Sequence, residues 1–126
     1  MKNPKKKRHQ EEKTVFVLTC DGHYALTKRP DQGLLASLWQ FPDTPGILET
    51  AQAVAWAEER GLLPKEIFRQ KEYKHIFTHV EWKMRGIFME VRNMGGGFVW
   101  MDGATLEAEA ALPTAYRQLW EDVTHV

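Results

Sequence analysis

Short runs of apolar residues, several of them β-branched or aromatic, recur along this chain and are typical of β-strands. Residues 14–19 and 23–28 form two such runs, and the Asp21-Gly22 pair between them is typical of a hairpin turn. Two longer runs, residues 65–78 and 81–92, predict a second antiparallel hairpin. After a glycine-rich turn, the letters FVWM predict one further short strand.

Helical spacing occurs in two segments. Apolar positions between residues 48 and 62 fit one face of a helix, with Thr50 as the expected N-cap and Gly61 as the stop signal. Residues 113–123 predict a closing helix with proline at its first turn. The segment 29–46 is rich in Pro and Gly yet strongly apolar, so we expect it to pack on the core. This order of elements predicts a mixed α+β sandwich.

Composition sets the size of the fold and its charge. The chain has 126 residues, 43% of them hydrophobic, which is enough for one domain with its own core. Residues 1–13 carry six Lys and Arg against two Glu, so that segment is net +4 and, because the whole chain is neutral, the remainder is net −4. A folded part that is net acidic restricts any DNA contact to a local patch or to one shared with another domain.

The first thirteen residues have no large apolar side chain after Met1 and are predicted to be a basic linker or tail. The folded domain is therefore expected over residues 14–126. The basic cluster Lys5–Arg8 fits a solvated linker, a nuclear address or a phosphate-binding arm, and its sequence does not separate these three.

Cys20 is the only cysteine, which excludes an internal disulfide and a four-cysteine zinc or iron–sulfur site built from this chain alone. We expect no cofactor in this chain. No apolar run of membrane-spanning length and no signal-peptide core is present, so we expect a cytoplasmic protein with no membrane contact. We also expect a monomer.

Glu58 and Glu59, followed by Gly61-Leu62, match the end of the Nudix signature, whose carboxylates hold Mg²⁺ against a diphosphate. The rest of the signature is missing. Val54 and Ala55 stand where its Arg and Glu belong, and Gly46 and Gln40 stand at its earlier Glu and Gly positions. We therefore expect solvated glutamates on a helix, with no catalytic and no metal-binding residues.

His75 and His79 flank a Phe-Thr pair at the predicted turn near residues 78–80. A metal site needs helical spacing or facing strands with carboxylates nearby, and the β-rich surroundings do not favour convergence of the two rings. No Ser or Cys neighbours them as a nucleophile, although acid–base chemistry by either histidine stays open. A turn supported by the Thr78 hydroxyl is the simpler interpretation.

Four blocks in sequence order carry a family resemblance: TVFVLTCDGHYALTKRPDQGLLASLWQFP, KHIFTHVEWKM, GGFVWM and ALPTAYRQLW. They resemble the C-terminal domain of the MutY family of adenine DNA glycosylases, which remove adenine mispaired with 8-oxoguanine. The resemblance covers nearly all of residues 14–123. It implies a Nudix-like α/β/α sandwich with a mixed β-sheet, related to the MutT hydrolase but without its catalysis.

The resemblance also implies a binding site. In that family a Phe-Ser-His loop is inserted at the 8-oxoguanine, and the matching residues here are Phe77, Thr78 and His79, with Thr in place of Ser. Phe77 is then expected to wedge beside the lesion, Thr78 to read it through a hydroxyl, and His79 to donate to a phosphate or base edge. His75 matches a histidine just before the family loop and is expected to touch the DNA backbone.

By the same resemblance, this chain is a non-catalytic piece of a longer bacterial enzyme. The parent would carry a catalytic domain with a [4Fe-4S] cluster, and the basic segment before residue 14 resembles the linker to that domain. The expected partners are that domain and double-stranded DNA with an 8-oxoguanine:adenine mispair. Two alternatives stay open: an active Nudix pyrophosphohydrolase on oxidised nucleoside triphosphates, and a protein-interaction domain.

Overall fold

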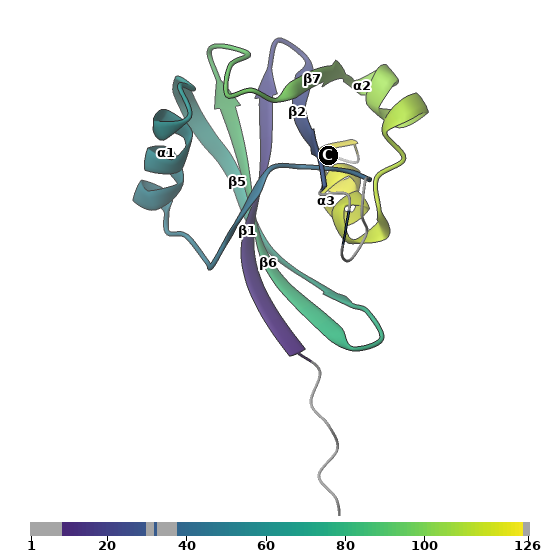
Figure 1. Cartoon of the computed structure of the whole chain (residues 1–126). Helices are drawn as coiled ribbons and strands as arrows, with labels where there is room; N and C mark the ends of the chain where they lie inside the picture. Colours follow the sequence, from purple (N-terminus) through teal and green to yellow (C-terminus); the bar gives the residue numbers. More distant parts are fainter. Residues whose placement is uncertain (1–8, 30–31, 33–37, 125–126) are drawn as a thin grey trace, which may run out of the picture.

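The computed structural model describes residues 9–29, 32 and 38–124. Its strands join in one sheet of order β3-β2-β1-β6-β5, with β4 on β1 and β7 on β2 (Figure 1). Their bounds are β1 His9–Cys20, β2 His23–Lys28, β3 Trp39–Gln40, β4 Asp43–Pro45, β5 Pro64–Ile76, β6 Val80–Val91 and β7 Val99–Asp102. β1 and β6 pair in parallel and the other pairs are antiparallel, so the predicted mixed sheet and both predicted hairpins are confirmed.

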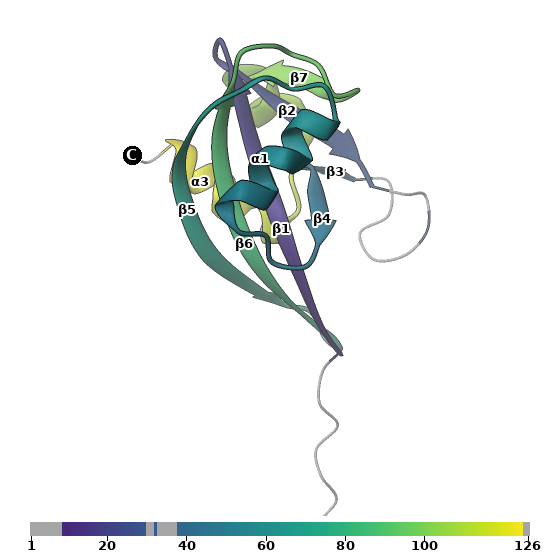
Figure 2. The same cartoon turned by 90° about the vertical axis from the view of Figure 1, so that its left-hand side faces the viewer.

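Helices cover both faces of the sheet. Helix α1, Thr50–Glu59, lies on one face, and helix α3, Thr114–Thr124, lies on the other, preceded by the short α2, Gly103–Thr105, and the π-helix η1, Leu106–Ala110 (Figures 1 and 2). The predicted α/β/α sandwich is confirmed. α2 and η1 were not predicted; α2 begins where the Asp102 side chain accepts a hydrogen bond from the Thr105 amide.

Alternation along β1 divides the core into two layers. Val15 and Val17 face the α3 side, where Tyr116 and Leu119 are buried, whereas Phe16 faces the α1 side. There the Phe16 ring stacks on Trp56 with centroids 3.8 Å apart. The period of two in the central strand thus gives each helix layer its own apolar surface.

Two local predictions need correction. Residues 9–13 were assigned to the linker, but they form the first part of β1, because their backbone groups pair with β6 although, apart from Lys13, their side chains are exposed or only half-buried. Residues 1–8, including the Lys5–Arg8 cluster, lie outside the described part. The N-cap of α1 is Glu49, not Thr50, and it makes a reciprocal capping box with Gln52.

The apolar loop at residues 29–46 packs on the core through Trp39 and Phe41, whereas Leu38 is exposed. Phe41 is fully buried, and Trp39 packs against the layer that contains Tyr116. The Phe16 amide donates to the Pro42 carbonyl, which ties the loop to β1. Two further apolar residues of this loop, Leu34 and Leu35, lie outside the described residues.

Asp122 anchors α3 to the edge strand β5. Its Oδ2 accepts hydrogen bonds from the Tyr73 hydroxyl and, at 2.9 Å, from the Lys71 ammonium, while Arg69 donates to its backbone carbonyl. The hydrogen bonds from Tyr73 and Lys71 hold the pKa of the Asp122 carboxyl below its usual range. A carboxylate in this position stabilises the folded state as long as it is ionised.

We predict that Asp122→Asn lowers the free energy of unfolding by about 1–2 kcal/mol at pH 7, since charge-assisted hydrogen bonds are lost. The folded-state pKa is depressed, so the difference is present above the unfolded pKa and disappears as the pH falls through the folded one. Urea unfolding from pH 7 to pH 3 measures it. Glu58→Gln, at an exposed helical carboxylate, is the matched control; equal curves for both variants would refute the anchor.

Candidate functional site

The loop Phe77–His79 joins β5 to β6 at the end of a hairpin that projects beyond both helix layers (Figure 1). The Phe77 amide closes it by donating to the Val80 carbonyl at 2.7 Å. A second hydrogen bond, at 3.0 Å, runs from the amide of His9, the first residue of β1, to the His79 carbonyl. The loop backbone is therefore held by its own hairpin and by the neighbouring strand.

The four predicted site residues do not all point the same way. Thr78 and His79 are exposed at the tip, whereas Phe77 and His75 are half-buried. The Phe77 ring meets His75 edge-on at 4.6 Å and meets Trp82 edge-on at 4.9 Å between centroids. The structure thus brings His75 and Phe77 together in an aromatic row and separates them from the side chains at the tip.

Trp82 is the buried platform of this row. It is 1% exposed, faces Tyr116 at 5.7 Å between ring centroids, and carries the Lys13 ammonium 3.6 Å above its ring. Burial lowers the pKa of Lys13, and the nearby Asp43 carboxylate, 3.4 Å from the ammonium, acts in the opposite direction. The Trp82 indole N–H has no hydrogen-bond partner within the described residues.

A polar network lies next to this platform. Arg29 donates to the Gln40 side chain at 2.6 Å and to the Tyr116 hydroxyl at 2.9 Å. The Tyr116 hydroxyl also lies 3.2 Å from an Asp43 oxygen. Burial, followed by the charge of Asp43, raises the pKa of Tyr116, which therefore stays a neutral donor. The network fastens segment 29–46 to α3.

Roles for Trp82, Lys13 and Tyr116 were not predicted from the sequence. The strand alternation of residues 82 and 84 was a usable signal for an inward Trp82. The Lys13–Trp82 and Arg29–Tyr116 contacts join residues that are far apart in the sequence. The local pattern of apolar and polar residues therefore does not predict them.

The helix that would carry a Nudix box is α1. Glu58 and Glu59 are exposed on it, and Ala55 occupies an exposed position where the signature has a carboxylate. No group of three or more His, Cys, Asp or Glu residues within the described ranges is arranged to hold a metal ion. At the start of α1, Glu49 instead pairs with Arg85 at 2.9 Å, and Arg85 also binds Glu72.

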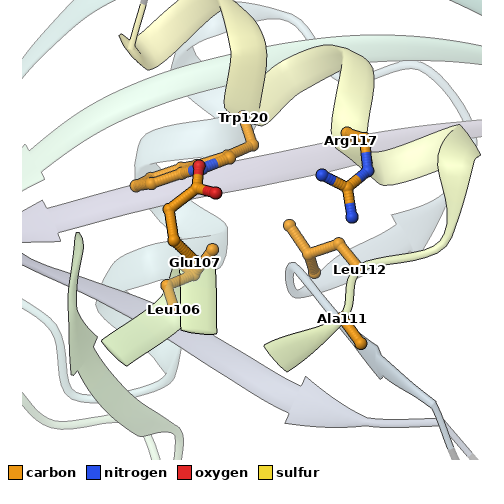
Figure 3. Close-up of a pocket in the computed structure, with 6 residues that line it drawn as sticks. All are labelled: Leu106, Glu107, Ala111, Leu112, Arg117 and Trp120. Atoms are coloured by element: carbon orange, nitrogen blue, oxygen red, sulfur yellow. The ribbon is translucent and has the colours of Figure 1, made fainter. Parts of the chain in front are cut away.

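A small recess beside α3 is lined by Leu106, Glu107, Ala111, Leu112, Arg117 and Trp120 (Figure 3). Its volume of about 10 Å³ admits roughly one water molecule. The Trp120 indole N–H donates to the Glu107 carboxylate, which Figure 3 shows facing the ring. This hydrogen bond joins the π-helix to α3, and the recess beside it is too small for a nucleotide.

Residues 14–122 match the sequence model of the NUDIX domain. The chain belongs to the NUDIX family. A sequence relative is an adenine DNA glycosylase of Arabidopsis thaliana, 33% identical over an alignment of 91 residues, with coverages of 60% of this chain and 14% of that protein. The chain thus spans about one seventh of this relative's length.

Two solved structures share the NUDIX fold of this chain. One is the C-terminal domain of mouse MUTYH, solved in complex with human PCNA, with a TM-score of 0.62, 24% identity and coverage of 91% of this chain and 88% of that one. The other is a MutT NUDIX hydrolase from Burkholderia pseudomallei, with a TM-score of 0.67, 18% identity and coverage of 91% and 98%. No helix among the described residues is long and apolar enough to span a membrane.

We predict that Tyr116→Phe lowers the free energy of unfolding by about 1–2 kcal/mol, because the buried Gln40 side chain and the half-buried Asp43 carboxylate lose the Tyr116 hydroxyl as a hydrogen-bond donor. Denaturant unfolding measures the change. Tyr24→Phe is the matched control, since no hydrogen bond of the Tyr24 hydroxyl is seen among the described residues and its ring contact with Trp120 is kept. Equal losses in the two variants would show that the network contributes nothing.

Proposed function

We propose that this chain is the lesion-recognition domain of an adenine DNA glycosylase and reads 8-oxoguanine opposite adenine. The observation that carries the proposal is the projecting loop, which presents Thr78 and His79 at an exposed tip clear of both helix layers. The sequence relative, named an adenine DNA glycosylase, supports it. So does the fold shared with the mouse MUTYH domain.

The chemistry of Thr78 suits the reading of 8-oxoguanine. Guanine offers an acceptor at N7, whereas 8-oxoguanine offers an N7–H donor and an additional carbonyl oxygen. A hydroxyl both donates and accepts, so an exposed Thr78 registers this change as a serine would. His79, exposed beside it, supplies a donor for a phosphate or a base edge.

To act as a wedge, the Phe77 ring has to give up its contact with Trp82. Its ring packs against Trp82 and the adjoining apolar layer, so insertion between bases exchanges this contact for stacking on DNA. Opening a base step costs about a few kcal/mol, which contacts formed on insertion must offset. His75, in edge contact with Phe77, then becomes available to the DNA backbone.

The net negative charge of residues 14–126 indicates that another domain supplies part of the DNA-binding surface. Residues 14–126 are net −4, so this chain by itself binds DNA weakly. In the proposed parent enzyme a catalytic domain holding a [4Fe-4S] cluster flips the adenine and hydrolyses its glycosidic bond. This domain then contributes specificity, and the chemistry takes place elsewhere.

In the full-length protein we predict that Thr78→Ala and Phe77→Ala each reduce discrimination between 8-oxoguanine:adenine and guanine:adenine substrates by about 1–3 kcal/mol, the scale of a base-edge contact. The ratio of kcat/KM for the two duplexes measures this. Thr50→Ala, at an exposed threonine on α1, is the control. If both loop variants keep the wild-type ratio, the loop does not read the lesion.

A NUDIX hydrolase acting on oxidised nucleoside triphosphates is the second candidate, favoured by the family match and by the fold shared with the MutT NUDIX hydrolase. The incomplete signature on α1 argues against it. We predict no release of pyrophosphate from 8-oxo-dGTP with Mg²⁺ above the level of Glu58→Gln. Turnover that Glu58→Gln abolishes would replace our proposal with hydrolysis.

Protein interaction is a third role compatible with the first. The mouse MUTYH domain was solved in complex with PCNA, a protein partner. In this chain an open groove is lined by Thr19, Tyr24, Phe68, Arg69, Phe88, Asp122 and Val123. Phe68 lies in β5 away from the hairpin tip, so a partner in this groove would leave the loop free for DNA.

A further inference from the structure

The first residues of β1 are polar and bury little, yet they form a regular strand. His9 to Lys13 pair in register with Val80 to Met84 of β6, the part of the hairpin nearest the loop. Their side chains are exposed or half-buried, so pairing with the backbone of β6 is the main reason for this strand. The other side of β6 is covered by β5.

This pairing turns the hairpin end into a three-stranded ribbon. A two-stranded hairpin alone is marginally stable in water, and a third strand is what normally gives it a fixed shape. β4 joins β1 only from Lys13 onward, so among the described strands β6 is the sole partner of His9 to Glu11. His9 to Glu11 therefore pair with the hairpin end alone, whereas Glu12 also accepts a hydrogen bond from the Gly46 amide and Lys13 also contacts β4.

The same segment contacts the loop by two routes. The His9 amide donates to the His79 carbonyl at 3.0 Å, which fixes the backbone at one end of the loop. At the other end of the segment, the Lys13 ammonium lies 3.6 Å from the centre of the Trp82 ring. The Phe77 ring of the loop contacts Trp82 edge-on. One route holds the loop backbone and the other supports the platform of its aromatic side chain.

We propose that His9–Lys13 is a positioning segment that sets the conformation of the Phe77–His79 loop and so links the loop to whatever is joined upstream. The functional part of this inference rests on the proposed reading of 8-oxoguanine. None of these residues needs to touch DNA for the effect, because they act through His79 and Trp82.

His9→Pro tests the backbone route. Proline removes the amide donor, and a strand tolerates it at the first position, so the fold should persist. His9→Ala keeps the amide and loses the same side chain, which makes it the matched control. The midpoint of urea unfolding, measured for both variants of this chain, checks that they fold. We expect it to be unchanged from the wild type.

Hydrogen exchange of the amides of residues 77–83 is the first readout and uses this chain alone. In His9→Pro we expect protection of the Phe77 amide and of the first residues of β6 to fall about two- to tenfold, the equivalent of one net hydrogen bond. His9→Ala should match the wild type. Equal protection in both variants overturns the positioning role, whatever the function of the loop.

Discrimination between 8-oxoguanine:adenine and guanine:adenine duplexes by the full-length protein is the second readout. We expect His9→Pro to reduce the kcat/KM ratio about two- to tenfold and His9→Ala to leave it unchanged. If Thr78→Ala lowers the ratio but His9→Pro does not, the inference is overturned and the proposed function stands. If the wild type shows no discrimination, the proposed function fails, and the exchange readout still decides whether the segment holds the loop.

Discussion

The parallel pairing of β1 with β6 is the constraint on which the rest of the structure depends. It runs over eleven residue pairs from His9 with Val80 to Thr19 with Glu90 and places the two strands that contribute most to the core side by side. Its register decides which side chains face α1 and which face α3, because a shift by one residue would exchange the two faces. Both helix layers and the position of the loop follow from this one register.

Much of the fold could be predicted because it is encoded locally. The hairpin turn at Asp21-Gly22, the long β5–β6 hairpin and the helices α1 and α3 each have a pattern within their own segment. The strand at residues 9–13 has no such pattern, since its partner is the backbone of β6 and its side chains are polar. The π-helix over 106–110 is joined to α3 by the hydrogen bond from Trp120 to Glu107, a contact that has no pattern within its own segment.

The candidate site also has a part that could be predicted from the sequence and a part that could not. Phe77, Thr78, His79 and His75 were predicted from a short contiguous motif, and the structure places them at one hairpin end. The groups that support them come from β1, β6 and α3 and meet only after folding, as the edge-on contact between the Trp82 and Tyr116 rings shows. The exposed tip can therefore vary in chemistry while the buried platform beneath it keeps its shape.

The parallel direction of β1 and β6 has a consequence for how this domain works within a longer chain. Since β6 leaves the loop and β1 runs alongside it, the point where the chain enters the domain lies next to the loop tip, with the His9 amide bonded to His79. In the proposed parent enzyme, an upstream domain tethered there would act on DNA bound by the loop at a high effective concentration, which depends on linker length and not on new contacts. Antiparallel pairing would move the tether to the opposite end of the sheet and weaken that advantage.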